Sequence, residues 1–209
     1  MNIILLGSSG LIGEQILNQL DRDPQVDALF CPARRPQAAS PKVHFLPMDP
    51  NSLPNPGDGN SWAVLCALGT TIKAAGSREA FESVDYGLVL AFARMAKEKG
   101  ILRFGVVSAL GADPGSSVFY NQVKGKMERD LRALGFPYLT IVQPSLLLGK
   151  RREFRLGEKL AQTLTAPVLR LIPKKYRPIQ ASRVAHALAE DLKRTEPGIQ
   201  IIANEVLWG

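Results

Sequence analysis

GSSGLIG, residues 7–13, is the stretch of sequence that decides the fold of this chain. It lies between a short apolar run, NIILLG at 2–7, and a segment at 11–23 whose apolar residues recur at helical spacing. A glycine-rich turn between a strand and a helix points backbone N–H groups outward at the helix N-terminus, where a pyrophosphate can bind. The pattern therefore predicts a strand–turn–helix unit that binds a dinucleotide.

Each glycine of this turn has a separate role in the predicted site. Gly7 permits the tight turn, Gly10 lets a phosphate approach, and Gly13 allows the helix to pack closely on the strand. A corner that needs glycine for its geometry alone is the alternative. The predicted cofactor contacts of this turn are Gly7, Ser8, Ser9, Gly10, Leu11, Ile12 and Gly13.

Apolar runs alternate with helix-period segments through the first 150 residues. Runs that are apolar on both faces and joined by helices indicate a parallel sheet covered on both sides. The sequence therefore predicts an α/β, Rossmann-like doubly wound sheet with helices on both faces. The predicted strands are 2–7, 26–31, 43–49, 62–69, 103–109 and 138–144, and the predicted helices are 11–23, 77–100 and 119–135.

The pattern loosens in the last quarter of the chain. We interpret the chain as a single domain in which residues 1–150 form the cofactor-binding core and 151–209 a small C-terminal substrate lobe. The arginines of a basic loop there, Arg151, Arg152 and Arg155, either select an anionic substrate or are solvated. The further elements expected are a helix near 156–171, a helix at 182–194 and a strand at 199–203.

The composition is that of a soluble globular protein. Of 209 residues, 45% are hydrophobic and 22% are charged, and no run of 18 apolar residues occurs. The N-terminus does not read as a secretion signal, and the two cysteines, Cys31 and Cys66, suit a reducing cytosol. We therefore expect a cytoplasmic protein without a membrane partner, either a monomer or a homodimer.

A net charge of +7 favours an anionic ligand. A phosphorylated cofactor, an anionic substrate and nucleic acid all carry the required charge. Proteins that bind single-stranded nucleic acid interleave aromatic with basic residues, and the basic stretches here lack that pattern. Nucleic acid is therefore not expected as a partner.

The end of the second predicted strand bears on the choice of cofactor. An acidic residue at this place accepts the ribose hydroxyls of NAD, whereas an arginine accommodates the 2′-phosphate of NADP. Here the strand is followed by Arg34 and Arg35, and the nearby acid, Asp27, lies at the other end. We therefore predict NADP(H) over NAD(H), with a solvated basic loop as the alternative. Asp49, which closes the third predicted strand, either reaches the adenine amino group or caps the next turn.

Tyr120 and Lys124 are the candidate catalytic pair. Residues four apart share one face of a helix, and the predicted strand before this helix includes Ser108. Reduction of a carbonyl by hydride creates an alkoxide that needs a proton, and a nearby ammonium makes a tyrosine a better acid–base group at neutral pH. We predict that Tyr120 donates the proton, that Lys124 tunes it and binds the nicotinamide ribose, and that Ser108 holds the substrate oxygen.

Together these motifs resemble the short-chain dehydrogenase/reductase superfamily, which has G-x-x-G-x-x-G, a serine after strand five and Y-x-x-x-K. More narrowly, CALGTTIKAAGSREAF (66–81), VSALGAD, FYNQVKGKME and QPSLLLG resemble the atypical branch that contains the Tat-interacting, oxidoreductase-like proteins. The resemblance implies that Leu68, Gly69 and Thr70 line the cofactor, and that Pro144 and Ser145 lie beside the nicotinamide. Helix capping is the alternative role for Thr70 and Thr71.

The chain departs from the superfamily pattern at two positions. Many members carry an asparagine in the helix after strand four, where this chain offers Asp85 as a substitute, and relatives often have arginine at the position of Gln143. The expected function is NADP(H)-dependent reduction of a small carbonyl substrate. The alternatives are an epimerase or dehydratase, and a sensor that binds NADP(H) and a protein partner without turnover.

Overall fold

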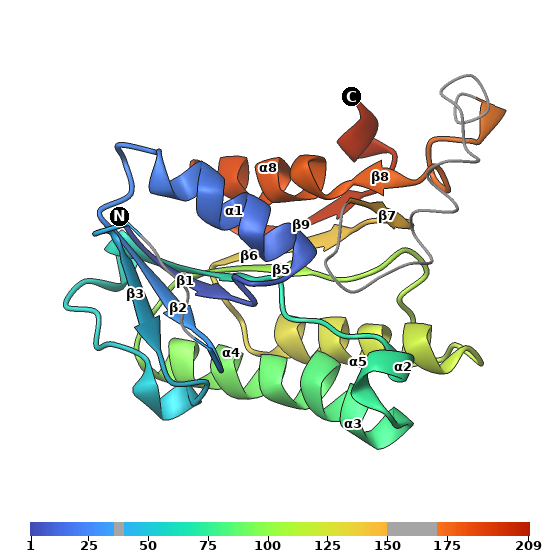
Figure 1. Cartoon of the computed structure of the whole chain (residues 1–209), viewed down its shortest axis with the longest axis horizontal. Helices are drawn as coiled ribbons and strands as arrows, with labels where there is room; N and C mark the ends of the chain where they lie inside the picture. The colour runs from blue at the N-terminus through green and yellow to red at the C-terminus, as the bar shows by residue number, and fades with distance from the viewer. Residues whose placement is uncertain (36–39, 150–170) are drawn as a thin grey trace.

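The computed structural model describes residues 1–35, 40–149 and 171–209 (Figure 1). The strands of its main sheet are β1 (Asn2–Leu6), β2 (Ala28–Pro32), β3 (Val43–Leu46), β4 (Trp62–Cys66), β5 (Arg103–Val107), β6 (Tyr138–Gln143) and β9 (Gly198–Ala203). A second, two-stranded sheet pairs β7 (Leu147–Leu148) with β8 (Ile179–Gln180).

The main sheet is parallel throughout the described residues, in the order β3-β2-β1-β4-β5-β6-β9. The direction in which the chain adds strands reverses between β1 and β4. Ligands of open α/β sheets bind outside the carboxyl ends of the strands at such a switch point. The predicted α/β, doubly wound fold is confirmed, and it directs attention to the ends of β1, β4, β5 and β6.

Helices cover both faces of this sheet (Figure 1). The helices of one face, α1 (Leu11–Asp21) and α8 (Ala181–Asp191), pack against each other and share a buried apolar cluster with β1 and β2. The other face has a second cluster beneath α4 (Val89–Glu98) and α5 (Phe119–Ala133). The shorter helices are α2 (Ile72–Ala75), α3 (Arg78–Glu82) and the 3₁₀ turns Pro50–Ser52, Gly59–Ser61 and Val206–Trp208.

The helical segment predicted at 77–100 differs from a single regular α-helix. It begins at α3, where Ser77 caps the helix, and continues through a π-helical segment, η3 (Ser83–Leu88), into α4. Gly100 follows α4 with a positive φ of 77°. π-Helical turns are rare and occur frequently at functional sites. Asp85 lies in this turn and is only 1% exposed.

The described part of the C-terminal segment joins the main fold. Helix α8 packs on α1, and β9 extends the main sheet beside β6. The helix expected near 156–171 and the basic loop with Arg151, Arg152 and Arg155 lie largely outside the described residues. Among the described helices, none has the length and apolar character needed to cross a membrane.

Candidate functional site

The glycine-rich turn joins β1 to α1, as the sequence predicts. Gly7 has a φ of 81°, which favours glycine, and its carbonyl accepts a hydrogen bond of 2.9 Å from the Gly10 N–H. A Cβ at Gly13 would lie 1.9 Å from the Gly7 carbonyl oxygen, so the helix can pack here only without a side chain. The turn thus has the close backbone packing and the free helix N-terminus that bind a pyrophosphate. Ser8 is buried, whereas Ser9 is exposed.

The predicted adenosine contacts lie at the ends of the neighbouring strands β2 and β3. Arg34 and Arg35 are exposed just after β2. Asp49 follows β3 and caps the turn that begins at Pro50, where its side chain accepts a 3.0 Å hydrogen bond from the Asn51 N–H. The capping alternative considered for Asp49 is therefore present in the structure. Its contact with adenine stays a prediction.

Lys124 forms a buried ion pair with Asp85. The ammonium nitrogen lies 2.7 Å from Oδ1 of Asp85, and the two side chains are 5% and 1% exposed. The other carboxylate oxygen of Asp85 accepts a 2.8 Å hydrogen bond from the Thr70 N–H. A Cβ on Gly69 would lie 3.3 Å from the carboxylate and 4.0 Å from the ammonium. Asp85 thus connects the helix that carries Lys124 to the loop after β4.

The pKa of Lys124 reflects two opposing influences. Burial is the largest single influence, and it lowers the pKa because it disfavours the charged ammonium form. The charge of Asp85, the charge of ionised Tyr120 and the hydrogen bond to Asp85 act in the opposite direction, and the pKa is raised above its ordinary value of 10.5. Lys124 therefore remains charged at neutral pH.

Tyr120 lies one helical turn before Lys124 and is half-buried at the start of α5. Its ring packs against Phe81 of α3, with the ring centroids 5.5 Å apart. Tyr120 and Lys124 both lie on α5, four residues apart, so they share one face of that helix. The helix spacing thus brings the predicted proton donor and its cation together.

Ser108, which follows β5, donates its hydroxyl hydrogen to Glu128 of α5 at 2.5 Å. Both residues are 4% exposed. Glu128 is a residue that the sequence analysis missed. The available signal was its spacing, because Tyr120, Lys124 and Glu128 are successive members of an i, i+4, i+8 series on one face of α5.

Ser145, which follows β6 and Pro144, is fixed by the buried amide of Asn204, a residue that the sequence analysis also missed. Oδ1 of Asn204 accepts a 2.9 Å hydrogen bond from the Ser145 N–H, and the Ser145 hydroxyl donates to the Arg177 carbonyl at 2.6 Å. The amide nitrogen of Asn204 donates to the carbonyls of Lys174 and Arg177. Asn204 lies just after β9, so the C-terminal segment fixes the loop after β6.

Leu68, Gly69 and Thr70 form the loop after β4. Leu68 is buried, Gly69 is exposed, and the backbone of Thr70 is held by Asp85. Thr71 caps α2 by accepting a 3.1 Å hydrogen bond from the Ala74 N–H. Cys66 ends β4, and burial raises the pKa of its thiol to about 12, so it is no nucleophile at neutral pH.

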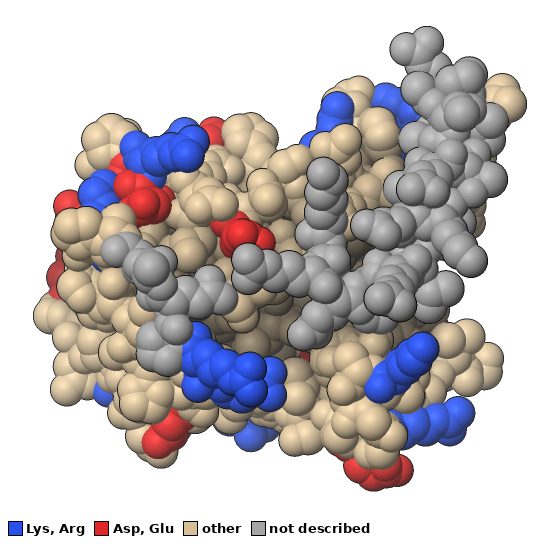
Figure 2. Space-filling view, viewed as in Figure 1, with Lys and Arg blue, Asp and Glu red and all other residues tan. Residues whose placement is uncertain are grey.

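These loops meet at one edge of the sheet. Figure 2 shows this face hollowed between the two helical layers, with lysine and arginine side chains on the rim. The loops after β1, β4, β5 and β6 supply the glycine turn, the Thr70 amide, Ser108 and Ser145, while α5 supplies Tyr120 and Lys124. The arrangement can hold an extended phosphorylated ligand and place an acid–base group beside it.

The chain matches the NAD(P)H-binding family over residues 7–194, and it belongs to that family. It also belongs with the FMP52 proteins, to which it is more than 30% identical over most of its length. The chain is 32% identical to the protein FMP52, mitochondrial, of Meyerozyma guilliermondii over 98% of this chain and 92% of that protein. It is 38% identical to the protein of the same name from Debaryomyces hansenii, over 73% and 70% of the two chains.

Solved structures share the fold at low identity. MoeE5 in complex with UDP-glucose and NAD superposes with a TM-score of 0.71 at 15% identity, covering 96% of this chain and 75% of that one. A UDP-glucose 4-epimerase of Thermotoga maritima gives 0.71 at 15% identity over 97% and 77%. The oxidoreductase ylbE of Lactococcus lactis gives 0.63 at 17% identity over 100% and 95%. These likenesses concern the fold alone.

The names of the curated relatives contradict the cytoplasmic location expected from composition. The FMP52 proteins are named mitochondrial. The cytosolic prediction was wrong because unpaired, buried cysteines indicate only a reducing environment. They carry no information on which compartment provides it.

Proposed function

We propose that this protein is an NADP(H)-dependent oxidoreductase that reduces a small carbonyl compound. The observation that carries the proposal is the buried Lys124–Asp85 pair, held against the loop after β4, with Tyr120 one helical turn away. A charged lysine fixed in this way beside a tyrosine suits acid–base work at a cofactor. A protein that only bound the dinucleotide would need the glycine turn but neither of these side chains.

The chain's own residues supply binding, orientation and a proton. Bound NADPH would supply the hydride to the carbonyl carbon. Tyr120 would then donate its phenolic proton to the carbonyl oxygen, and the ammonium of Lys124 would stabilise the phenolate that remains. Two hydrogens of that ammonium are not used by Oδ1 of Asp85, and one of them suits a ribose hydroxyl.

Arg34 supports NADP(H) over NAD(H). Its guanidinium is exposed at the end of β2, where this fold holds the adenosine ribose, and it offers a planar set of donors to a 2′-phosphate. An acidic residue that could bind the ribose of NAD is absent from this strand end, and the nearby acid, Asp27, directly precedes β2 at its opposite end. Arg35 lies beside it and extends the same positive charge.

NADPH oxidation over a panel of aldehydes, ketones and quinones tests the proposal. We expect turnover with at least one compound, and a fall of about 100-fold or more in Tyr120→Phe, because general acid catalysis contributes about 10²- to 10⁴-fold. Tyr86→Phe is the matched control, since the Tyr86 hydroxyl donates to the part-buried carboxylate of Asp130 at 2.7 Å. Equal turnover in Tyr120→Phe and the control would overturn the mechanism. Tight NADPH binding without turnover across the panel would instead favour the sensor.

A further inference from the structure

The carboxylate of Glu128 is surrounded by hydrogen-bond donors in the interior. The Ser108 hydroxyl lies 2.5 Å from Oε1, and the amide nitrogen of Gln143 lies 2.9 and 3.0 Å from the two oxygens. Arg132 approaches Oε2 at 3.1 Å. Three residues from α5, β6 and the end of β5 thus converge on one buried acid.

The chemistry of these groups fixes where the serine hydrogen lies. The side-chain nitrogens of Gln143 and Arg132 are donors only, so they face a carboxylate that accepts. An ionised carboxylate has no hydrogen to give, and the short contact with Ser108 therefore uses the serine's own hydrogen. A hydroxyl has one hydrogen and two lone pairs. With its hydrogen directed at Glu128, Ser108 has only lone pairs left for other partners.

This orientation opposes the role expected for Ser108 from the sequence. To stabilise a developing alkoxide, a group must donate a hydrogen to it. Ser108 would first have to leave Glu128, which would remove a hydrogen-bond donor from a buried carboxylate and is therefore unfavourable. Tyr120 and Lys124 are not limited in this way, because the fold does not use all of their hydrogens. They are therefore the donors that can reach the substrate oxygen.

We propose that Glu128 is a positioning residue that commits the Ser108 hydrogen to the interior and makes Ser108 a hydrogen-bond acceptor in the site. The group that binds Ser108 is then a hydroxyl of the substrate. Together with the proposed carbonyl reduction, on which this step rests, the substrate is a hydroxycarbonyl compound. Its carbonyl oxygen faces Tyr120 and its hydroxyl faces Ser108.

The orientation of Ser108 can be measured without any substrate. In a 1:1 mixture of H₂O and D₂O, a serine whose hydroxyl hydrogen exchanges slowly shows two ¹³Cβ signals, one for each isotope. We expect such a doublet for Ser108 in the NADPH-bound protein with ¹³C-labelled serine, assigned through Ser108→Ala. Glu128→Gln should collapse it, whereas Glu82→Gln, which removes a half-exposed carboxylate paired with Lys126, should leave it. A single averaged signal in the wild-type protein would overturn the proposal.

Substrate preference tests the acceptor role. Hydroxyacetone and 2-hydroxycyclohexanone are compared with acetone and cyclohexanone as NADPH-dependent substrates. We expect a preference in kcat/KM of about tenfold for the hydroxylated member of each pair, which is the value of one net hydrogen bond. Ser108→Ala and Glu128→Gln should remove the preference, while Tyr120→Phe should lower both members alike.

The two experiments separate this inference from the proposed function. A doublet for Ser108 with no turnover of any ketone would support the role of Glu128 and count against the reductase. Turnover of the plain ketones without preference for the hydroxyketones would support the reductase and overturn the substrate class. A preference that survives Glu128→Gln would show that Glu128 has only a structural role.

Discussion

Asp85 neutralises the candidate site before any cofactor binds. Its carboxylate compensates the buried charge of Lys124, and it also accepts a hydrogen bond from the Thr70 amide. An asparagine at this position would accept the same hydrogen bond without the charge. The buried ammonium of Lys124 therefore depends energetically on the charge of Asp85.

Replacement of Asp85 should therefore be costly. We expect Asp85→Asn to lower the free energy of unfolding by about 3–5 kcal/mol, because it leaves the buried ammonium of Lys124 without a countercharge. The double variant Asp85→Asn/Lys124→Met should recover most of this loss. Urea unfolding at pH 7 measures both. Equal stability of Asp85→Asn and the wild-type protein would show that water or another group satisfies the ammonium.

The same pair predicts how stability depends on pH. The folded-state pKa of Lys124 is raised above its ordinary 10.5, so its contribution is complete below about pH 10.5 and is lost as the pH rises through the folded value. We expect the stability difference between wild type and Lys124→Met to be constant from pH 7 to 9 and to shrink above pH 10.5. A difference that shrinks between pH 7 and 9 would contradict the raised pKa.

At the residue scale, the sequence could predict which residues share a helix face, and the chemical roles of Tyr120, Lys124 and Ser108 stay predictions. Tyr120 and Lys124 are four residues apart, and the sequence alone indicated that they share a helix face. Glu128 follows the same spacing, but its role depends on Ser108 and Gln143, which lie 20 and 15 residues away. No local pattern shows that such an acid is buried.

At the scale of elements, the β1–α1 turn has no room for a side chain at Gly13. We expect Gly13→Ala to weaken NADPH binding at least tenfold and to destabilise the protein by about 1–3 kcal/mol, because the new Cβ would lie 1.9 Å from the Gly7 carbonyl oxygen. Gly57→Ala is the control, since its Cβ would meet nothing within 4 Å. NADPH titration and urea unfolding measure the two effects. Unchanged cofactor affinity in Gly13→Ala would count against the predicted pyrophosphate site.

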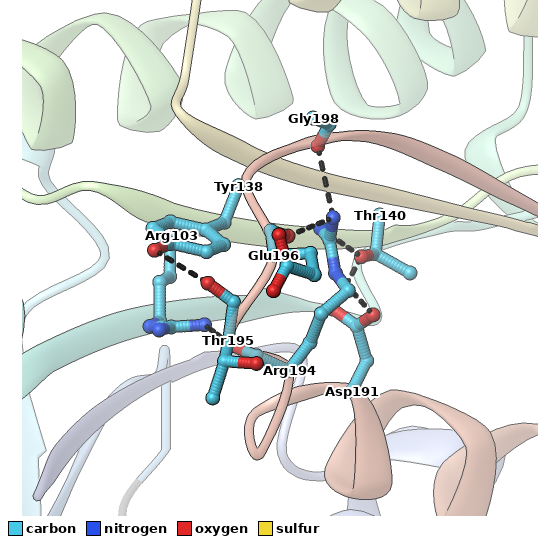
Figure 3. Close-up of polar contacts among 8 residues, drawn as sticks. All are labelled: Arg103, Tyr138, Thr140, Asp191, Arg194, Thr195, Glu196 and Gly198. Atoms are coloured by element: carbon cyan, nitrogen blue, oxygen red, sulfur yellow. Dashed lines mark hydrogen bonds and ion pairs between the residues drawn. The ribbon is translucent and has the colours of Figure 1, made fainter.

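A second element-scale feature is the turn between α8 and β9, which Arg194 holds (Figure 3). Its guanidinium donates to the carbonyls of Glu196 and Gly198 at 3.0 and 3.2 Å, and it forms an ion pair with Asp191 at 3.0 Å. It also approaches the Thr140 hydroxyl at 3.3 Å. The turn therefore depends on one side chain that closes several backbone and side-chain contacts.

We expect Arg194→Ala to lower the free energy of unfolding by about 1.5–3 kcal/mol, because hydrogen bonds to a charged group contribute more than neutral ones. Lys193→Ala, which removes an exposed ion pair with Glu190, should change it by less than about 1 kcal/mol. NADPH affinity should stay unchanged, since Arg103 and Tyr138, which stack beside this turn, begin β5 and β6 at the edge opposite the site. A change in affinity would show that the turn influences the cofactor.

The strands of the main sheet and its long helices could be predicted from hydrophobic periodicity and from glycine and proline boundaries, whereas α2 and the small sheet of β7 and β8 were not predicted. Apolar runs and glycine or proline boundaries located each strand of the main sheet to within a few residues. The π-helical turn η3 was not foreseen, because apolar spacing along 77–100 fits an ordinary helix. Its position is linked to Asp85 and Lys124, a contact across 39 residues that periodicity does not contain.

At the scale of the whole molecule, the cofactor should act as a part of the fold. The glycine turn, the loop after β4 and helix α5 are separate in the sequence. Only the order of strands and helices along the chain indicates that they meet in the fold. A ligand that bridges them binds the folded chain and not the unfolded one, so its binding energy adds to stability. Cofactor-dependent stability therefore tests the assembled site independently of any substrate.

We expect NADPH at about 100 times its dissociation constant to raise the free energy of unfolding by about 2.7 kcal/mol. For a chain of this length, that corresponds to an increase in Tm of about 5–10 °C. NADH at the same concentration should stabilise less, because Arg34 offers its guanidinium to a phosphate that NADH lacks. Arg34→Ala should reduce the difference between the stabilisation by NADPH and the stabilisation by NADH. Arg22→Ala, which replaces an exposed arginine at the C-terminus of α1, should leave that difference unchanged. Thermal unfolding followed by circular dichroism measures each of the three proteins with each cofactor. Equal stabilisation of the wild-type protein by NADH and NADPH would contradict the predicted role of Arg34.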